Sequence, residues 1–296
     1  MIALVFAALS GLSYGASDFS GGLAAKHNDA VVVTIAVQLV SVVSLGLILA
    51  LSAPATVTPA DLAWGGLGGL GAMVGLTTFY RALADGPMTT AASVTGLVGS
   101  LVPVVTGLTL GEVPNNITLA GIGLAIPAGI VVSAGGIGST GLPLAVVPPR
   151  VRARRRYDIA QTRRLSVVAG CGFGLFFVAL AQVSSEAGLY PLVGARAASV
   201  IGLALVLTAT HRWAVPHRAD WVAIAVAGVL DCGANSFYLL ALTDASFTWV
   251  AAVVSLYPVA TVLLARALLA ERIVRIQVAG LVGAASALVL VGVGAT

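Results

Sequence analysis

Charged residues are scarce in this sequence. Asp, Glu, Lys and Arg make up 9% of its 296 residues, whereas a soluble domain has about 25%. A chain so poor in charge cannot cover a water-facing surface. Hydrophobic residues make up 59% of the sequence, and its mean hydropathy is +1.05. We therefore expect the chain to fold within a lipid bilayer.

Cysteine and histidine are also too few and too scattered to build a metal centre or a disulfide framework. The two cysteines, Cys171 and Cys232, lie inside apolar runs, where a thiol behaves as a small hydrophobe. The three histidines, His27, His211 and His217, fall in loops or at the ends of apolar runs. The sequence therefore predicts no metal site.

Nucleotide-binding motifs are missing as well. The sequence has no P-loop, so we expect no ATP-driven activity unless a partner subunit supplies it. Residues 66–71 match G-x-G-x-x-G, but no strand precedes them and their surroundings are apolar, so a dinucleotide role is not expected. The net charge of +4 comes from one short segment and indicates no nucleic-acid partner. We predict no cofactor.

Long apolar runs make up most of the sequence. A helix needs about 20 apolar residues to cross the hydrocarbon core, and ten stretches qualify. The runs are continuously apolar, which favours helices over the alternating strands of a barrel. The predicted fold class is an all-α polytopic membrane protein with ten transmembrane helices. The predicted spans are 2–24, 30–52, 61–83, 88–110, 116–137, 165–186, 191–210, 219–242, 246–269 and 274–294.

Residues 139–164 form a long polar segment that carries seven arginines. This basic linker separates a first repeat, residues 1–138 (spans 1–5), from a second repeat, residues 165–296 (spans 6–10). Gln38 of the first half corresponds to Arg196 of the second. Because five spans is an odd number, a tandem copy would insert upside down. Such inverted repeats are typical of secondary transporters, whose substrate site lies near the membrane midplane between the repeats.

Lys and Arg are distributed very unevenly between the two predicted sides. Fourteen of the fifteen lie on the side of the linker, and the remaining one, Arg196, lies inside a span. The positive-inside rule then places the linker in the cytoplasm and both termini outside. We expect a multi-pass protein of the bacterial plasma (inner) membrane.

Several short motifs recur in the same order in the two halves. They comprise Gly11, Gly15, Phe79, Tyr80, Leu110, Gly111, Glu112 and Gly121, then Gly170, Gly174, Phe237, Tyr238, Tyr257, Pro258, Ala270, Glu271 and Gly280, with residues 194–199 in the seventh span. This ensemble resembles the EamA family of the drug/metabolite transporter superfamily over nearly the whole chain outside the linker. The resemblance implies efflux or exchange of small metabolites, amino acids or drugs by alternating access.

Three ionisable side chains lie well inside predicted spans: Asp18, Arg196 and Asp231. A charge at a helix centre costs about 2.5–3.5 kcal/mol on insertion scales, so such groups usually face a cavity or a partner. Tyr14 shares a helix face with Asp18. We interpret Asp18 as a carboxylate that binds a cation or a proton in a central cavity. Alternatively, it is hydrated near the cytoplasmic end or pairs with Lys26.

Asp231, Asn235 and Tyr238 form one stripe on the eighth span. Thr77 and Tyr80 share the corresponding face of the third span. Two such faces suit two walls of one substrate pocket, with Asp231 as a second candidate proton carrier. Alternatively, the stripe hydrogen-bonds neighbouring helices, a common use of polar groups in membranes.

Arg196 is expected to pair with Asp231 or Asp18, or to bind a substrate carboxylate through its fork of donors. Snorkelling to the interface is the alternative, because it lies near the start of its span. Tyr257 on the ninth span is a further candidate for the pocket wall. Pro103 and Pro258 interrupt spans 4 and 9 and serve as bending points or as static kinks.

The leading hypothesis is a secondary transporter, an exporter of a small organic metabolite, amino acid or drug-like solute by alternating access with proton coupling. Its partners are the small-molecule substrate and the bilayer, and a monomer is compatible with the sequence. The alternatives are a membrane-embedded enzyme and a non-transporting scaffold. An enzyme needs a nucleophile–base pair or a metal cluster, and no His lies within a span, so we do not expect an enzyme.

Overall fold

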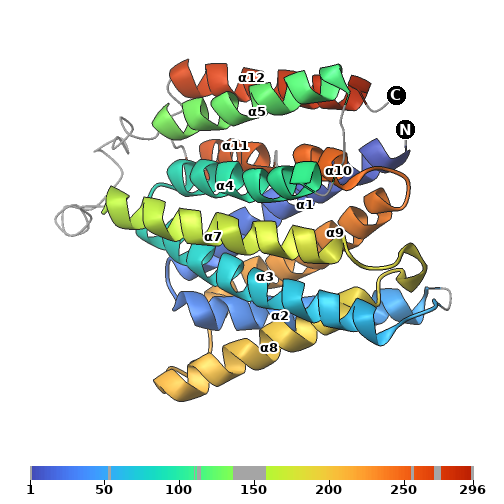
Figure 1. Cartoon of the computed structure of the whole chain (residues 1–296). Helices are drawn as coiled ribbons and strands as arrows, with labels where there is room; N and C mark the ends of the chain where they lie inside the picture. The colour runs from blue at the N-terminus through green and yellow to red at the C-terminus, as the bar shows by residue number, and fades with distance from the viewer. Residues whose placement is uncertain are drawn as a thin grey trace.

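A computed structural model describes residues 2–52, 55–109, 111, 115–135, 158–254, 257–269 and 275–294 (Figure 1). Most of the predicted linker, and the motif residues Glu112 and Glu271, lie outside these ranges. Within them the chain is helical and has no strand. The helices are α1 (Ile2–Ala25), α2 (Ala30–Ala50), α3 (Pro59–Asp85), α4 (Met88–Thr109), α5 (Asn116–Gly135), α7 (Ile159–Leu180), α8 (Pro191–Thr210), α9 (Trp221–Leu242), α10 (Phe247–Val254), α11 (Tyr257–Leu269) and α12 (Arg275–Gly294), with short 3-10 helices η1 (Ser185–Ala187) and η2 (Arg218–Asp220).

The prediction of an all-α polytopic membrane protein is confirmed. Among the described residues, eight helical segments are long and apolar enough to cross a membrane, and α12 contributes a shorter apolar helix over Val278–Ala287. Each predicted span overlaps one helix, except that the ninth, 246–269, is divided between α10 and α11. The chain is an integral multi-pass membrane protein.

The sixth predicted span begins earlier than expected, at Ile159 rather than at residue 165. The Asp158 side chain caps this helix by accepting a hydrogen bond from the Gln161 N–H at 3.0 Å. Arg163 and Arg164, assigned to the linker from the sequence, therefore lie in α7. A boundary drawn from apolarity alone misses a polar first turn that a capping residue starts.

The contacts between helices follow a twofold pattern. A contact between a helix of the first half (α1–α5) and one of the second half (α7–α12) is matched by a contact between their counterparts in the opposite halves. Helix α1 packs on α9, and α7 packs on α3; α2 packs on α9, and α8 packs on α3. Likewise α4 packs on α7, while α10 and α11 pack on α1. Further contacts join corresponding helices of the two halves: α2 with α8, α5 with α12, and α4 with α10 and α11.

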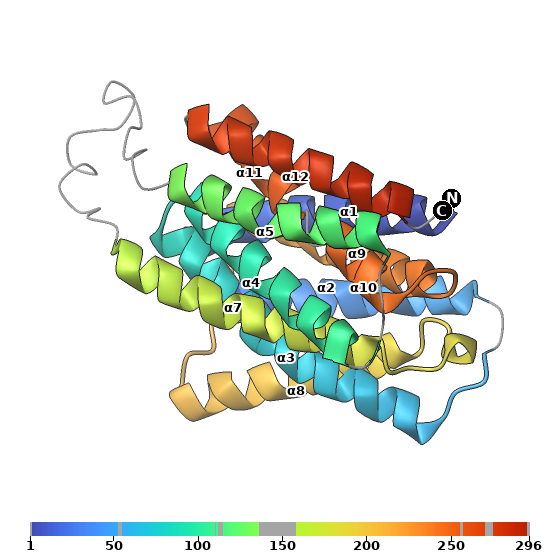
Figure 2. The same cartoon turned by 45° about the horizontal axis from the view of Figure 1, so that its top comes forward.

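The two ends of the helix bundle differ in charge. Helix α1 begins and α12 ends at one end, called the terminus end, while α5 ends and α7 begins at the opposite, linker end (Figures 1 and 2). Apart from Arg196, the Lys and Arg residues that the structure describes gather at the linker end: Lys26, Arg81, Arg163, Arg164, Arg212, Arg218, Arg266 and Arg275.

Two buried aspartates that occupy corresponding positions tie the halves together, one at each end. At the terminus end, Asp61 of α3 accepts a hydrogen bond from the Ser184 N–H at 2.8 Å. At the linker end, Asp220 accepts one from Asn28 Nδ2 at 2.8 Å and lies 3.2 Å from His27 Nδ1. We call these contacts the terminus-end latch and the linker-end latch.

Close packing of α3 against α7 leads to a stability prediction. A Cβ on Gly172 would collide with the backbone of Gly71 and Gly75, which cannot move aside as a side chain could. We expect Gly172→Ala to destabilise the fold by about 1–3 kcal/mol through overpacking. Gly46→Ala is the matched control, because nothing lies within 4 Å of its Cβ position. Thermal unfolding in detergent should show a lower midpoint for Gly172→Ala and an unchanged or higher one for Gly46→Ala.

Candidate functional site

An ion pair lies at the centre of the bundle, between α8 and α9. Arg196 Nη2 is 2.7 Å from Asp231 Oδ2, and both residues are buried. Arg196 Nη1 donates a hydrogen bond to Gln38 Oε1 of α2. Gln38 and Arg196 occupy corresponding positions in the two halves, so equivalent positions meet each other where α2 packs on α8. Arg196 is therefore held inside the bundle and does not snorkel.

Hydrogen bonds extend the ion pair into a network that spans both halves. Ser41 Oγ donates to Asp231 Oδ2 at 3.1 Å, and Asn235 Nδ2 donates to Asp231 Oδ1 at 3.2 Å. Tyr14 OH of α1 donates to Asn235 Oδ1 at 2.7 Å. Because helices α1, α2, α8 and α9 all contribute, movement of one half relative to the other must disturb these contacts.

Asp18 lies in the same region but is not part of this network. The residue is 3% exposed, and it lines a small chamber together with Arg196 and Asp231. Among the described residues, no hydrogen bond or ion pair holds its carboxylate, and it does not pair with Lys26. An isolated buried carboxylate is costly unless it is protonated or meets a cation. The described chamber walls therefore offer no counter-charge to an ionised Asp18.

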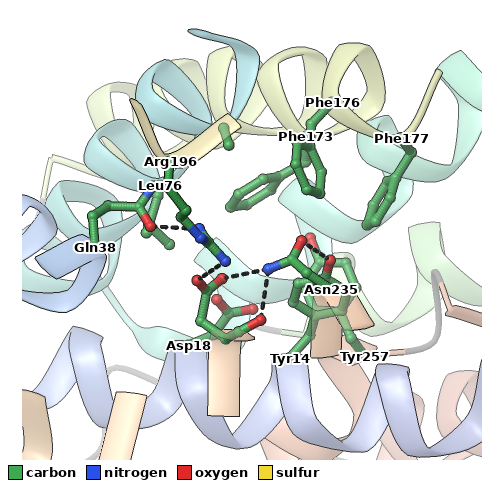
Figure 3. Close-up of a pocket in the computed structure, with 12 residues that line it drawn as sticks. Tyr14, Asp18, Gln38, Leu76, Phe173, Phe176, Phe177, Arg196, Asn235 and Tyr257 are labelled. Carbon is green, nitrogen blue, oxygen red and sulfur yellow. Dashed lines mark hydrogen bonds and ion pairs between the residues drawn. The ribbon is translucent and has the colours of Figure 1, made fainter. Parts of the chain in front are cut away.

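Aromatic side chains form much of the remaining chamber wall (Figure 3). Phe173, Phe176 and Phe177 project from α7 toward the polar groups, and Tyr257 enters from α11. Figure 3 shows the three phenyl rings across the chamber from Arg196 and Asn235. The chamber leaves about 20 Å³ free, which is room for a single water molecule or little more. In this conformation it is too small for an organic solute.

Residues 165–293 match the family model described as the EamA-like transporter family. The matched region, which is most of the second half of the chain, is called the EamA-like half. A solved structure described as "Crystal structure of protein" has a TM-score of 0.63 and 16% sequence identity, with 97% of each chain covered. At 16% identity this similarity shows a shared fold and nothing more. The search of curated proteins gives no match.

The chamber draws on both the EamA-like half and residues 1–138. Of the residues predicted for the site, six line it: Tyr14, Asp18, Arg196, Asp231, Asn235 and Tyr257. Thr77, Tyr80 and Tyr238 do not line it. On α3 the chamber face is formed by Ala72 and Leu76 instead.

Tyr80 and Tyr238 are both fully buried and occupy corresponding positions in the two halves. Tyr238 OH donates a hydrogen bond to the Phe177 carbonyl at 3.0 Å, and their rings lie 4.9 Å apart. The Tyr80 ring lies against α1, where a Cβ on Gly21 would overlap it. Tyr80 of α3 therefore packs on α1, and Tyr238 of α9 packs on α7. In each case the partner is the first helix of a half.

A second cavity, the vestibule, opens at the terminus end of the EamA-like half. It is about 330 Å³ and lies between the segment joining α7 to α8 and the segment joining α9 to α10. Leu180 of α7 lines the vestibule, while Phe177, one helical turn earlier, lines the chamber. Phe177, which packs on Tyr238, therefore lies on the side of the chamber nearest the vestibule.

Sequence reasoning missed several chamber residues. Phe173, Phe176 and Phe177 lie at i, i+3 and i+4 of α7, a spacing that marks one helix face, but apolar residues on a membrane helix give no contrast with lipid-facing ones. Gln38 was identified only as the counterpart of Arg196, although a buried amide in a span is itself a signal.

The two prolines expected to bend spans lie in different settings. Pro103 is inside the continuous helix α4. Pro258 lies in the first turn of α11, beyond the end of α10 at Val254, and its side chain lies outside the described set. A first turn tolerates proline because its N–H has no helical partner there.

Proposed function

We propose that the chain is a secondary transporter that moves a small organic solute by alternating access, with the chamber as its binding site. Residues 1–138 and 165–296 act as the two repeats, and residues 139–164 link them. The observation that carries the proposal is the exchange pattern of helix contacts around a central, buried and charged chamber. Substrate sites of inverted-repeat transporters lie at that place.

In the proposed cycle the small chamber widens and opens at one end of the bundle and then at the other. Arg196, Asp231 and Asn235 would contact solute, and the two latches would close the two ends in turn. At the terminus end the vestibule approaches the chamber along α7, where Leu180 lines the vestibule and Phe177 lines the chamber. We assign release to that side, which makes the protein an exporter if the basic linker faces the cytoplasm.

A screen of several classes of solute is the first test of this function. The full chain in detergent is screened by thermal shift against amino acids, sugars, nucleosides and amphipathic amines. Solutes that raise the unfolding midpoint are then tested for uptake into proteoliposomes. We expect at least one of these classes both to stabilise the protein and to be carried across the bilayer. If the solutes that stabilise the protein never cross the bilayer, the protein only binds them, and the transport function is refuted.

Asp18 is the proposed proton carrier, because Asp231 is already neutralised by Arg196. One carboxylate cannot hold a proton and a cationic group together, so each would displace the other. An acidic vesicle lumen should then stimulate uptake by the wild-type protein. In Asp18→Asn the uptake should be the same with and without the gradient, whereas Asp231→Asn should retain the stimulation. Equal stimulation in Asp18→Asn would remove Asp18 from the coupling step.

A further inference from the structure

The charges around the chamber do not cancel. Arg196 is matched by Asp231 at 2.7 Å, and Gln38 accepts a second hydrogen bond from its guanidinium. Asp231 in turn accepts from Ser41 at 3.1 Å. Asp18, buried and lining the same chamber, has no hydrogen bond or ion pair among the described residues. With both carboxylates ionised, the chamber has one negative charge in excess.

The chamber wall suits a positive group. The rings of Phe177, Tyr14, Tyr257 and Phe173 follow one another with centroid separations of 5.7, 6.3 and 6.4 Å. Aromatic faces attract ammonium groups within about 6 Å, most strongly where water is excluded. The Tyr257 hydroxyl is buried and has no hydrogen-bond partner in the described parts of the chain. It is an acceptor available to an N–H donor.

Other solute classes fit less well. An anion would meet Asp18 without compensation, while the Arg196 guanidinium is already held by Asp231 and Gln38. A neutral solute would leave Asp18 isolated. A zwitterion is the nearest competitor, because Arg196 Nε has no hydrogen-bond partner in the described structure and one carboxylate oxygen could reach it.

We propose that the chamber binds an organic monocation, an ammonium group on an apolar or aromatic body, with Asp18 as its counter-ion and the aromatic rings as its cage. This inference rests on the transport function proposed above and adds the class of solute. Tyr257 takes an N–H of the ammonium group, and the Arg196–Asp231 pair stays intact when the cation binds.

Four probes that share one phenyl group separate these classes: 2-phenylethylamine (cation), 2-phenylethanol (neutral), phenylalanine (zwitterion) and 3-phenylpropionate (anion). Binding of radiolabelled 2-phenylethylamine to the full chain in detergent is measured at pH 7, with the other three as competitors. We expect the amine to bind and to outcompete all three. Asp18→Asn should weaken amine binding roughly 30-fold or more, because a buried charge partner is lost. Tyr257→Phe should weaken it about fivefold.

Asp85→Asn is the matched control, because Asp85 is an exposed carboxylate at the linker end of α3. It should bind the amine as the wild type does, and the unfolding midpoint of each variant reports whether it folds. Tighter binding of the alcohol, the acid or phenylalanine, or binding of no probe, would overturn the cation assignment. So would amine binding that is unchanged in both Asp18→Asn and Tyr257→Phe.

The outcomes also separate this inference from the transport function. If a solute of another class is carried across proteoliposomes, transport stands and the cation assignment falls. If the amine binds in an Asp18-dependent way but never crosses the bilayer, the cation site stands and the transport function falls.

Discussion

Replacing Arg196 by Met is expected to destabilise the folded protein by about 3–5 kcal/mol, because it leaves a buried charge without its partner. Asp231 lies 2.7 Å from the guanidinium and is buried in the chamber wall. Ser41 and Asn235 would still donate to its carboxylate, but neutral donors do not supply the lost charge. Thermal unfolding of the purified protein in detergent should show a large drop in midpoint.

The double variant Arg196→Met with Asp231→Asn tests the cause. Neutralising both partners removes the uncompensated charge, so most of the stability lost in the single variant should return. Arg212→Met is the control, since Arg212 forms an exposed pair with Asp29 at 3.6 Å and exposed pairs contribute about 0–1 kcal/mol. A single variant as stable as the wild type would mean that the ion pair is not what holds α8 to α9.

The sequence was most informative where a polar residue interrupts an apolar run. Asp18, Arg196 and Asp231 were identified because each charge in a span is costly, and all three line the chamber. The contact between Arg196 and Asp231, one of the pairings considered, could not be chosen from spacing alone. It depends on how α8 and α9 pack on α2, which is a property of tertiary structure.

The face of α3 shows the limit of that reasoning. Thr77 and Tyr80 share a helix face, but Ala72 and Leu76 line the chamber. A rotation of about 100° separates neighbouring positions on a helix, and on a helix with so many small and apolar residues polarity does not fix the rotation. Its glycines fix it instead, because Gly71 and Gly75 lie against Gly172 of α7.

The latches were not predicted from the sequence either. Asp61 and Asp220 are as far apart in the chain as other pairs of repeated residues, but this separation alone does not indicate a contact. Both lie at the start of a helix, where Asp is common as a capping residue. Only the structure places each beside a loop of the other half. Capping accounts for Asp61 in part, since it forms a capping box with Thr58.

Removing one latch is expected to open the chamber toward that end. A charged hydrogen bond contributes about 1.5–3 kcal/mol, and 1.4 kcal/mol changes a population tenfold. Asp220→Ala should therefore raise access from the linker end about tenfold or more, and Asp61→Ala should do so from the terminus end. Ala72→Cys, in a chain with Cys171→Ser and Cys232→Ser, places one thiol in the chamber wall. Its labelling rate by a membrane-impermeant thiol reagent is measured from each side of sealed vesicles.

The controls distinguish latch loss from weaker helix capping. Thr58→Ala removes the other member of the capping box of α3 but leaves the contact of Asp61 with Ser184. It should not change labelling from either side, and neither should Asp85→Ala at the linker end. If Asp61→Ala and Asp220→Ala speed labelling from the same side, the two aspartates do not act as opposed closures. Opposite effects from Asp61→Ala and Asp220→Ala would mean that an aspartate at corresponding positions of the two halves holds each end of the bundle shut.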